Sequence, residues 1–144
     1  MNVIDSNLSF VFGVGGEDKK NSSSWILQEW KAPKTERPWG YYRVLHEQDK
    51  EVKVKEITVE PGKCLSMQRH QDRAEHWFVA EGTASVYSLN RSTDVELKGV
   101  YNKFDSLHIS KTEWHQLCNE TDDPLKIIEI QYGDNCIEDD IERK

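Results

Sequence analysis

The stretch Pro61–Gly82 reads PGKCLSMQRHQDRAEHWFVAEG and carries the densest group of metal-binding residue types in the chain. It places Gln68, His70, Glu75 and His76 within nine positions, between two glycines and beside an apolar strand-like ending. Imidazole, carboxylate and amide groups held next to short strands are typical of a metal site inside a small β-barrel. The rest of the chain is therefore interpreted as the shell around this stretch.

A second stretch, HQLCN at His115–Asn119, follows about forty residues later and adds an imidazole from a different hairpin. Two histidine nitrogens, one carboxylate and one amide oxygen suit a transition metal rather than calcium or magnesium. We expect one divalent ion, zinc in the first place, with manganese, iron or nickel as alternatives. A single negative ligand leaves the ion net positive and a stronger Lewis acid. The remaining histidines, His46 and His108, have no such neighbours in the sequence.

Strand periodicity alone does not choose between Glu75 and His76. Residues i and i+2 of a strand share a face, so Gln68 and His70 point the same way. In an unbroken strand His76 would join them, because Glu75 is an odd number of positions after His70. The polar residues 71–73 look like a turn, however, and a turn would allow Glu75 to point inward instead.

Length and charge limit the possible classes of protein. At 144 residues the chain is most simply one domain, and its content of 36% hydrophobic and 31% charged residues is globular. The net charge of −7 argues against nucleic acid or an anionic membrane as a partner, because both require a basic face. An anionic small molecule would need locally placed lysine or arginine residues.

The cysteines and the N-terminus both suggest the cytoplasm. Cys64, Cys118 and Cys136 are odd in number and far apart, which fits free thiols in a reducing compartment better than a disulfide framework. The first ten residues, MNVIDSNLSF, do not read as a signal peptide. No segment approaches the roughly 20 apolar residues of a membrane span.

Residues 1–36 are expected to form an irregular N-terminal arm, and residues 37–144 one compact domain. Within the arm, Leu8–Phe12 could be a strand that extends a partner's sheet, and Ser24 could cap a short helix. Turns every 8–12 residues beyond Arg37 favour an all-β barrel or sandwich. The acidic tail after Tyr132 is expected to lie loose or to form a helical turn. The expected strands are Tyr41–Leu45, Val52–Val59, Trp77–Val79, Ala84–Leu89, Leu107–Ile109, His115–Cys118 and Leu125–Tyr132.

The two histidine-containing stretches resemble the two cupin motifs. The spacing from Gly62 to Gly82 matches the first motif, with Gln68 in place of its first histidine, and His115-x3-Asn119 matches the end of the second. Five further segments narrow the resemblance to type II phosphomannose isomerases, the cupin domain at the C-terminus of bifunctional mannose-1-phosphate guanylyltransferase/isomerases. These segments are RPWGY from Arg37, LSxQxH from Leu65, RAEHW from Arg73, PLxxIEIQxG from Pro124 and EDDIxR from Glu138.

The resemblance implies a double-stranded β-helix, or jelly roll. It also implies a divalent metal held by Gln68, His70, Glu75 and His115, and interconversion of mannose 6-phosphate and fructose 6-phosphate. The chain departs from the family in three ways. It has no nucleotidyltransferase domain, it has Ser110 and Thr112 where the second motif usually has proline and glycine, and it stops before the family's final arginine.

An isomerase of this kind needs a base and an anchor for phosphate. Glu129 is the candidate base, because it shares a strand face with Gln131 on the expected barrel lining. Lys55, Arg73 and Arg143 are the candidate phosphate partners. The expected partners are a phosphorylated sugar and a second copy of the chain in a homodimer. The alternatives are a non-catalytic sugar-phosphate-binding cupin, or another metal-cupin enzyme such as an iron dioxygenase.

Overall fold

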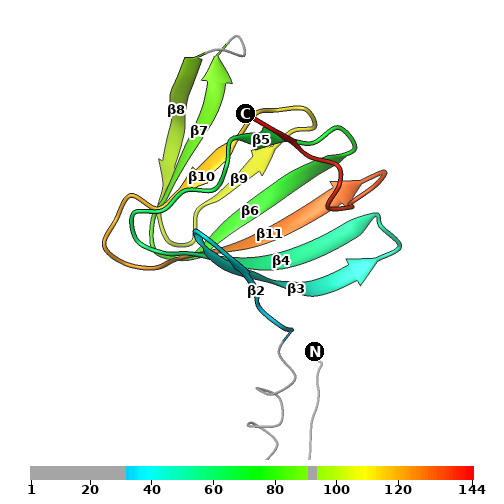
Figure 1. The fold of residues 1–144 in the computed structure, drawn as a ribbon, viewed down its shortest axis with the longest axis horizontal. Helices are drawn as coiled ribbons and strands as arrows, with labels where there is room; N and C mark the ends of the chain where they lie inside the picture. The colour runs from blue at the N-terminus through cyan, green and yellow to red at the C-terminus, as the bar shows by residue number, and fades with distance from the viewer. Residues whose placement is uncertain (1–31, 91–93) are drawn as a thin grey trace, which may run out of the picture. The chain divides into compact units, whose positions relative to one another are not determined.

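The computed structural model describes residues 32–90 and 94–144, and within these ranges it contains strands and no helix (Figure 1). The prediction of an all-β domain is therefore confirmed. The strand expected at Leu8–Phe12 and the helix expected after Ser24 lie outside the described residues. In chain order the strands are β2 (Thr35–Arg37), β3 (Gly40–Gln48), β4 (Val52–Val59), β5 (Gln68–Arg69), β6 (Arg73–Glu81), β7 (Ala84–Asn90), β8 (Asp94–Tyr101), β9 (Ser106–Ile109), β10 (Gln116–Cys118), β11 (Leu125–Gly133) and β12 (Glu142–Arg143).

The strands of residues 32–144 pair antiparallel in three sheets. The largest has the order β2-β3-β4-β11-β6-β9, a second has the order β10-β7-β8, and β12 pairs with β5. The late strand β11 lies between β4 and β6, so the chain returns to the middle of the large sheet (Figure 1). The hydrophobic core is shared by the two larger sheets. Its buried members are Ile57, Val59, Trp77, Val79, Ala84, Val86, Leu107, Ile109, Leu117, Leu125 and Ile127.

The inner face of the large sheet changes from apolar to polar along its strands. Alternate residues of β4 and β11 are buried, as expected for strands with one face on a core. Cross-strand rows at one end of β4, β11 and β6 are hydrophobic, while rows at the other end carry charged and polar groups. The apolar rows contain Ile57, Ile127 and Val79 with Val59 and Leu125, and the polar rows contain Lys53, Gln131 and Glu75, then Lys55, Glu129 and Trp77. One continuous sheet therefore supplies both the core and a buried polar site.

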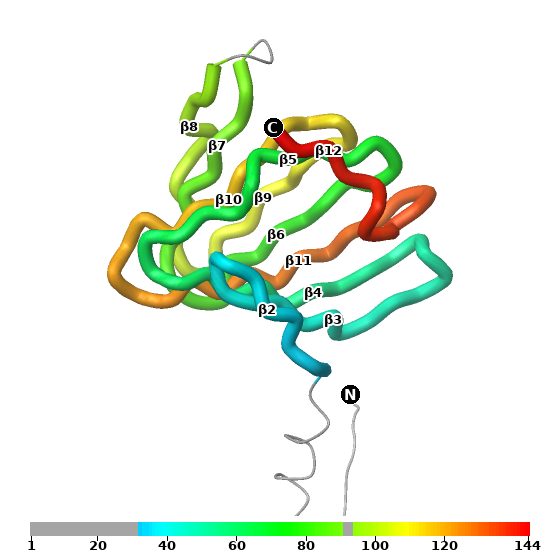
Figure 2. Tube along the Cα trace, in the orientation of Figure 1, coloured from blue at the N-terminus to red at the C-terminus, as the bar shows by residue number. Residues whose placement is uncertain are grey.

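The sequence-based strands agree with the structure in the core and not at its edges. Val52–Val59 is β4 to the residue, and the other expected strands overlap β3, β6, β7, β9, β10 and β11. Strand β8 was not expected. Its side chains are mostly exposed, and although Tyr101 at its end packs against the core, the strand has no alternation of buried and exposed residues. The tail was expected to be loose or helical, but its last residues form β12, which lies beside β5 (Figure 2).

Two backbone positions show why turn chemistry matters in this fold. Gly82 follows β6 with φ of +85°, and a Cβ there would lie 2.4 Å from the carbonyl oxygen of Pro124. Thr112 has φ of 64°, in the left-handed region that glycine favours. Its amide donates a 2.7 Å hydrogen bond to the carbonyl of His70, so the backbone of the second motif keeps a glycine-like turn without the glycine.

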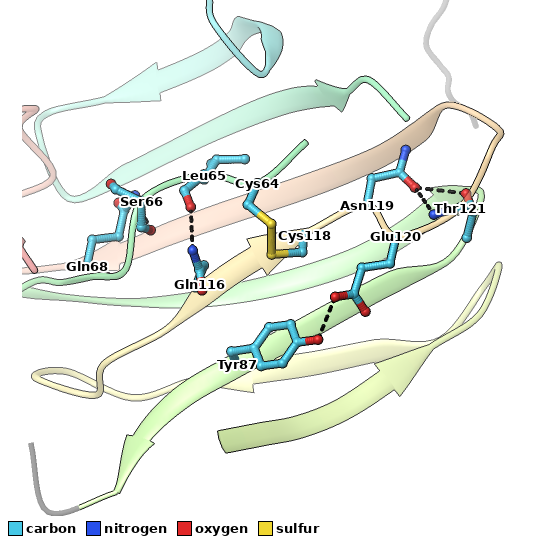
Figure 3. Close-up of a disulfide and its surroundings, with 10 residues drawn as sticks. All are labelled: Cys64, Leu65, Ser66, Gln68, Tyr87, Gln116, Cys118, Asn119, Glu120 and Thr121. Carbon is cyan, nitrogen blue, oxygen red and sulfur yellow. Dashed lines mark hydrogen bonds between the residues drawn. A yellow bond between two sulfur atoms is a disulfide. The ribbon is translucent and has the colours of Figure 1, made fainter. Parts of the chain in front are cut away.

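Cys64 and Cys118 form a disulfide, with sulfur atoms 2.06 Å apart and Cα atoms 4.1 Å apart (Figure 3). The prediction of free thiols was therefore wrong for these two residues, and only Cys136 is a free thiol among the described residues. The two half-cystines are 54 residues apart in sequence. They meet because their segments pair as an antiparallel bridge, a contact that cysteine spacing does not reveal. No helix in the described residues is long and apolar enough to cross a membrane.

Candidate metal and substrate site

His70, Glu75 and His115 converge at the polar end of the inner face. One ligand atom from each lies within 4.8 Å of the others, and all three residues are buried. Nε2 of His70 lies 3.2 Å from Glu75 Oε2, and Nε2 of His115 lies 3.6 Å from Glu75 Oε1. The ring centroids of the two histidines are 5.2 Å apart. These three residues, called the triad below, form a possible metal site.

The outer nitrogen of each imidazole is bound by a backbone carbonyl. Nδ1 of His70 lies 2.6 Å from the carbonyl oxygen of Asp140, and Nδ1 of His115 lies 2.9 Å from that of Glu113. Because a carbonyl oxygen only accepts, each Nδ1 carries hydrogen and donates. Burial lowers the pKa of His115, which keeps that ring neutral. Its Nε2 lone pair then faces Glu75, the arrangement that metal-binding histidines adopt.

Glu75 is the anion of the triad. Only 1% of its surface is exposed, and burial alone would raise its pKa. The neighbouring His70, His115 and Arg73 instead hold the pKa of Glu75 well below its usual value. Arg73 Nε and Nη2 each lie 3.1 Å from Oε2, and Trp77 Nε1 donates to Oε1 over 3.0 Å. The sequence left Glu75 and His76 open, and the structure buries Glu75 and exposes His76.

Gln68 lies beside the triad on β5. Its backbone exchanges two 2.9 Å hydrogen bonds with His115, a pairing that places the two side chains next to each other. Its amide Nε2 donates to the carbonyl oxygen and hydroxyl of Ser66, at 3.3 and 3.2 Å. The amide oxygen is therefore the group that Gln68 can offer to a ligand.

A small cavity adjoins this donor set. It measures about 20 Å³ and is lined by Gln68, His115, Trp77 and Glu129, among other residues. That volume holds one small species, since a water molecule needs at least about 10–15 Å³ on a comparable measure. Of the four donors, Gln68 and His115 line this cavity. The donor set as a whole, two imidazole nitrogens, a carboxylate and an amide oxygen, fits a divalent transition metal.

Glu129 is one of the residues that line both the small cavity and a larger one. Gln131 Nε2 donates to its Oε1 over 2.8 Å, and Trp77 Nε1 donates to its Oε2 over 3.1 Å. Burial, followed by the negative charge of Glu75, raises the pKa of Glu129 to about 8. A buried carboxyl group with this pKa can hold or release a proton near neutral pH.

The larger cavity measures about 500 Å³ and contains all three expected phosphate partners, Lys55, Arg73 and Arg143. The structure does not leave them equally available. Lys55 Nζ pairs with Glu138 at 2.9 Å, and Arg73 is bound to Glu75 and to the carbonyl oxygen of Ile137. Although burial opposes ionisation of Glu138, Lys55 and Lys53 outweigh it and lower the pKa of Glu138 to about 2.

Arg143 and Arg37 are the exposed cations of the large cavity. Both line it, and neither has a recorded ion pair within residues 32–90 and 94–144. The Arg37 guanidinium lies 5.4 Å from the ring centre of Tyr42, a cation–π distance. Arg143 was predicted from the sequence as a phosphate partner, whereas Arg37 was missed, although Arg37 opens the RPWGY segment of the resemblance.

Other residues singled out from the sequence have structural contacts. Asn119 is fully buried, and its side-chain amide donates to the carbonyls of Val59 and Asp123, while its side-chain oxygen accepts from Thr121 (Figure 3). His46 and His108 are exposed, and His108 Nε2 lies 2.6 Å from the Tyr132 hydroxyl. None of these three residues contacts the triad. The hydrogen bonds of Asn119 therefore stabilise a loop and do not position a metal ligand.

Trp77 was missed as a site residue. It lies two positions after Glu75 on β6 and therefore on the same face, so strand alternation was the signal that pointed to it. Its indole nitrogen bridges the carboxylates of Glu75 and Glu129, and its ring packs edge-on against His115 with centroids 5.7 Å apart. It connects the triad to the candidate base.

Residues 27–144 match the family model described as the C-terminal part of mannose-6-phosphate isomerase. The chain belongs to this family. Its relatives include the alginate biosynthesis protein AlgA of Pseudomonas fluorescens, 43% identical over 107 residues. Mannose-1-phosphate guanylyltransferase of Escherichia coli K12 is 41% identical over 107 residues. Both alignments cover 74% of this chain and 21% of the relative, so the chain spans about a fifth of the length of these relatives.

Solved structures confirm the double-stranded β-helix architecture of the chain. A double-stranded β-helix protein from Klebsiella pneumoniae superposes with a TM-score of 0.63 at 16% identity, covering 81% of this chain and 92% of that one. The capsular polysaccharide assembling protein CapF from Staphylococcus aureus gives a TM-score of 0.67 at 13% identity, covering 77% of this chain and 33% of that one. At such identities the likeness shows the double-stranded β-helix and nothing about chemistry.

Proposed function

We propose that this cupin domain is a metal-dependent isomerase that interconverts mannose 6-phosphate and fructose 6-phosphate. The observation that carries the proposal is the position of Glu129, a buried carboxyl group between the triad and a cavity with exposed arginines. A cavity of about 500 Å³ is within the range that binds small ligands. Membership in the mannose-6-phosphate isomerase family supports the choice of sugar.

In this proposal Gln68, His70, Glu75 and His115 hold one divalent ion, with zinc as the first candidate. The ion would act as a Lewis acid toward the sugar's carbonyl oxygen, a role suited to a site with one negative ligand. The backbone carbonyls at Asp140 and Glu113 orient the two imidazoles, and Trp77 and Arg73 fix the carboxylate of Glu75. The protein's own contribution is thus a preorganised and water-poor donor set.

Glu129 is the proposed base. Conversion of mannose 6-phosphate to fructose 6-phosphate removes a proton from C2 and adds one at C1, while the hydroxyl and carbonyl oxygens exchange a proton. One carboxyl group facing a cis-enediol can carry the carbon-bound proton between adjacent carbons. Hydrogen bonds from Gln131 and Trp77 hold the Glu129 carboxyl group in place throughout.

Arg143 and Arg37 are the proposed phosphate partners. A substrate with about two negative charges needs a local cationic contact to enter a chain of net charge −7. Of the expected partners, Lys55 and Arg73 are already neutralised by Glu138 and Glu75. Guanidinium groups can also bind phosphate through two parallel hydrogen bonds.

A homodimer and a cytoplasmic location stay proposals. Strand β8 is an edge of its sheet and exposes Val95, Leu97 and Val100, and open apolar edges are normally covered. We expect a second copy to cover it, and light scattering that finds only monomer at micromolar concentration would exclude this. The disulfide removes one sequence argument for the cytoplasm, since disulfides favour oxidising compartments.

The test is a coupled assay of fructose 6-phosphate formation with Glu129→Gln. This change keeps the size of the side chain and removes its ability to accept a proton. We expect kcat to fall by roughly 10²- to 10⁴-fold, while bound metal per chain is unchanged. Glu96→Gln, an exposed carboxylate on β8, is the control and should keep wild-type activity. Wild-type activity in Glu129→Gln would exclude the proposed base, and turnover absent from the metal-loaded wild type would favour a non-catalytic sugar-phosphate-binding cupin.

A further inference from the structure

The end of the chain contacts the loop that carries His70. A single residue, Asp140, makes three hydrogen bonds to three consecutive residues of that loop. Its carbonyl oxygen accepts from His70 Nδ1 at 2.6 Å, and its two carboxylate oxygens accept from the amides of Gln71 and Asp72, each at 2.9 Å. The ring and the backbone that carries it are therefore held by the same residue.

The neighbours of Asp140 fix the register of this contact. From here on, the tail means residues 137–144. Within it, β12 pairs with β5 so that Glu142 lies opposite Arg69 and Arg143 opposite Gln68. Arg69 Nε donates to Glu142 over 2.7 Å, and the amide of Lys144 donates to the carbonyl of Met67 over 2.9 Å. Figure 2 shows the tail running alongside β5. The tail is thus paired with the segment that holds two of the four proposed ligands.

We propose that Asp140 is a positioning residue for His70, and that docking of the tail and metal binding at the triad favour each other. The inference rests on the proposed metal site. An imidazole that donates Nδ1–H to a carbonyl is fixed in ring orientation, with Nε2 directed at the ligand. His70 Nε2 accordingly lies 3.2 Å from Glu75 Oε2. Because coupling between two binding events is reciprocal, a metal that needs this orientation must also stabilise the docked tail.

The tail also forms one wall of the large cavity. Glu138, Asp139, Ile141 and Arg143 all line it, and Glu138 closes ion pairs with Lys53 and Lys55 at 3.0 and 2.9 Å. Docking of the tail therefore orients a metal ligand and completes the substrate cavity in one step. A metal ion bound at the triad should therefore favour the docked tail and the complete cavity. When the tail is undocked, His70 loses its orienting contact and the cavity loses one wall.

The first measurement is the zinc affinity of the full-length chain, by competition with a chromophoric chelator. Asp140→Ala removes both carboxylate acceptors, and we expect its zinc affinity to fall by roughly 10- to 100-fold. Asp140→Asn keeps one acceptor oxygen and should lie between wild type and Asp140→Ala. The matched control is Asp105→Asn, because Asp105 also caps a turn amide, that of Asn102 at 2.8 Å, away from the triad. Its zinc affinity should equal that of wild type.

The second measurement is hydrogen exchange of the tail, with and without zinc. A purely structural role for Asp140 would leave exchange independent of metal. Coupling predicts that zinc slows exchange of the Lys144 amide in wild type, and slows it less in Asp140→Asn. Should Asp140→Ala fail to fold, Asp140→Asn decides both measurements.

The outcomes separate this inference from the metal site itself. Wild-type zinc affinity in a folded Asp140 variant, or tail exchange that zinc does not change, would overturn the coupling and leave the metal site standing. A wild-type chain that binds no zinc would overturn both.

Discussion

Glu75 shows how one buried carboxylate organises a site. It is almost fully buried, yet two neighbouring histidines and Arg73 hold its pKa low, and the indole N–H of Trp77 donates to its Oε1. A buried charge of this kind is costly unless it is paired. Most of the residues that pair with Glu75 come from its own stretch of sequence, and His115 comes from the position just before β10. This explains why so many polar residues lie close together in the first motif.

The histidines should control metal content. We expect His115→Ala and His70→Ala each to lose most of the bound zinc, because each removes a neutral nitrogen donor. The affinity should also fall as pH drops below roughly 6, since only neutral imidazole binds metal and burial lowers the pKa of His115. Metal analysis after gel filtration measures this. His46→Ala is the control, and unchanged metal in both variants would contradict the site.

Arg143 should contribute to recognition of an anionic substrate. We expect Arg143→Ala to lose about 1.5–3 kcal/mol in kcat/KM, roughly 10- to 160-fold, from a charge-assisted hydrogen bond to phosphate. Metal content should not change, because its side chain is not a ligand. Lys63→Ala, an exposed cation outside the cavity lining, is the control. Kinetics identical to wild type would exclude Arg143 from this role.

Among the elements, the tail should make the stability of the fold depend on pH, through the ion pairs of Glu138. Its pKa of about 2 in the folded protein is below the ordinary 4.5, so its ion pairs stabilise the fold above pH 4.5. This stabilisation is lost as pH falls toward 2. The urea midpoint of unfolding should therefore fall more between pH 5.5 and pH 3 in the wild type than in Glu138→Gln. Equal drops would show that the lysine pairs do not stabilise the protein.

The disulfide should stabilise the hairpin pairing around Gln68 and His115. We expect Cys64→Ser combined with Cys118→Ser to lower the free energy of unfolding by about 2–4 kcal/mol, measured in urea. Zinc should still bind, because the backbone bonds between Gln68 and His115 remain. Thiol titration of unreduced, denatured wild type should find one free thiol, Cys136, and three free thiols would refute the bridge.

Elements with a core-facing pattern could be predicted, and elements made by pairing alone could not. Strand β4 alternates buried and intermediate residues and was placed to the residue, whereas β8 is mostly exposed. β5 and β12 are two residues each and exist because they pair with each other. The disulfide and the contacts of Asp140 also join segments far apart in sequence, so no local pattern could predict them.

At the scale of the molecule, the candidate site belongs to the same sheet as the core. The apolar end of β4, β11 and β6 packs against the second sheet, and the polar end carries Glu75, Glu129 and Lys55. Periodicity could place these residues on the inner face, but their neighbours depend on register across strands. This is why Glu129 could be named as a candidate, while its bridge to Glu75 through Trp77 could not.

Metal-dependent isomerisation can be tested directly in one assay. The full-length chain, loaded with one zinc ion, is mixed with mannose 6-phosphate, and fructose 6-phosphate is followed before and after a chelator is added. We expect turnover that stops when the chelator removes the metal and returns when zinc is restored. A fully loaded protein that forms no fructose 6-phosphate would contradict it.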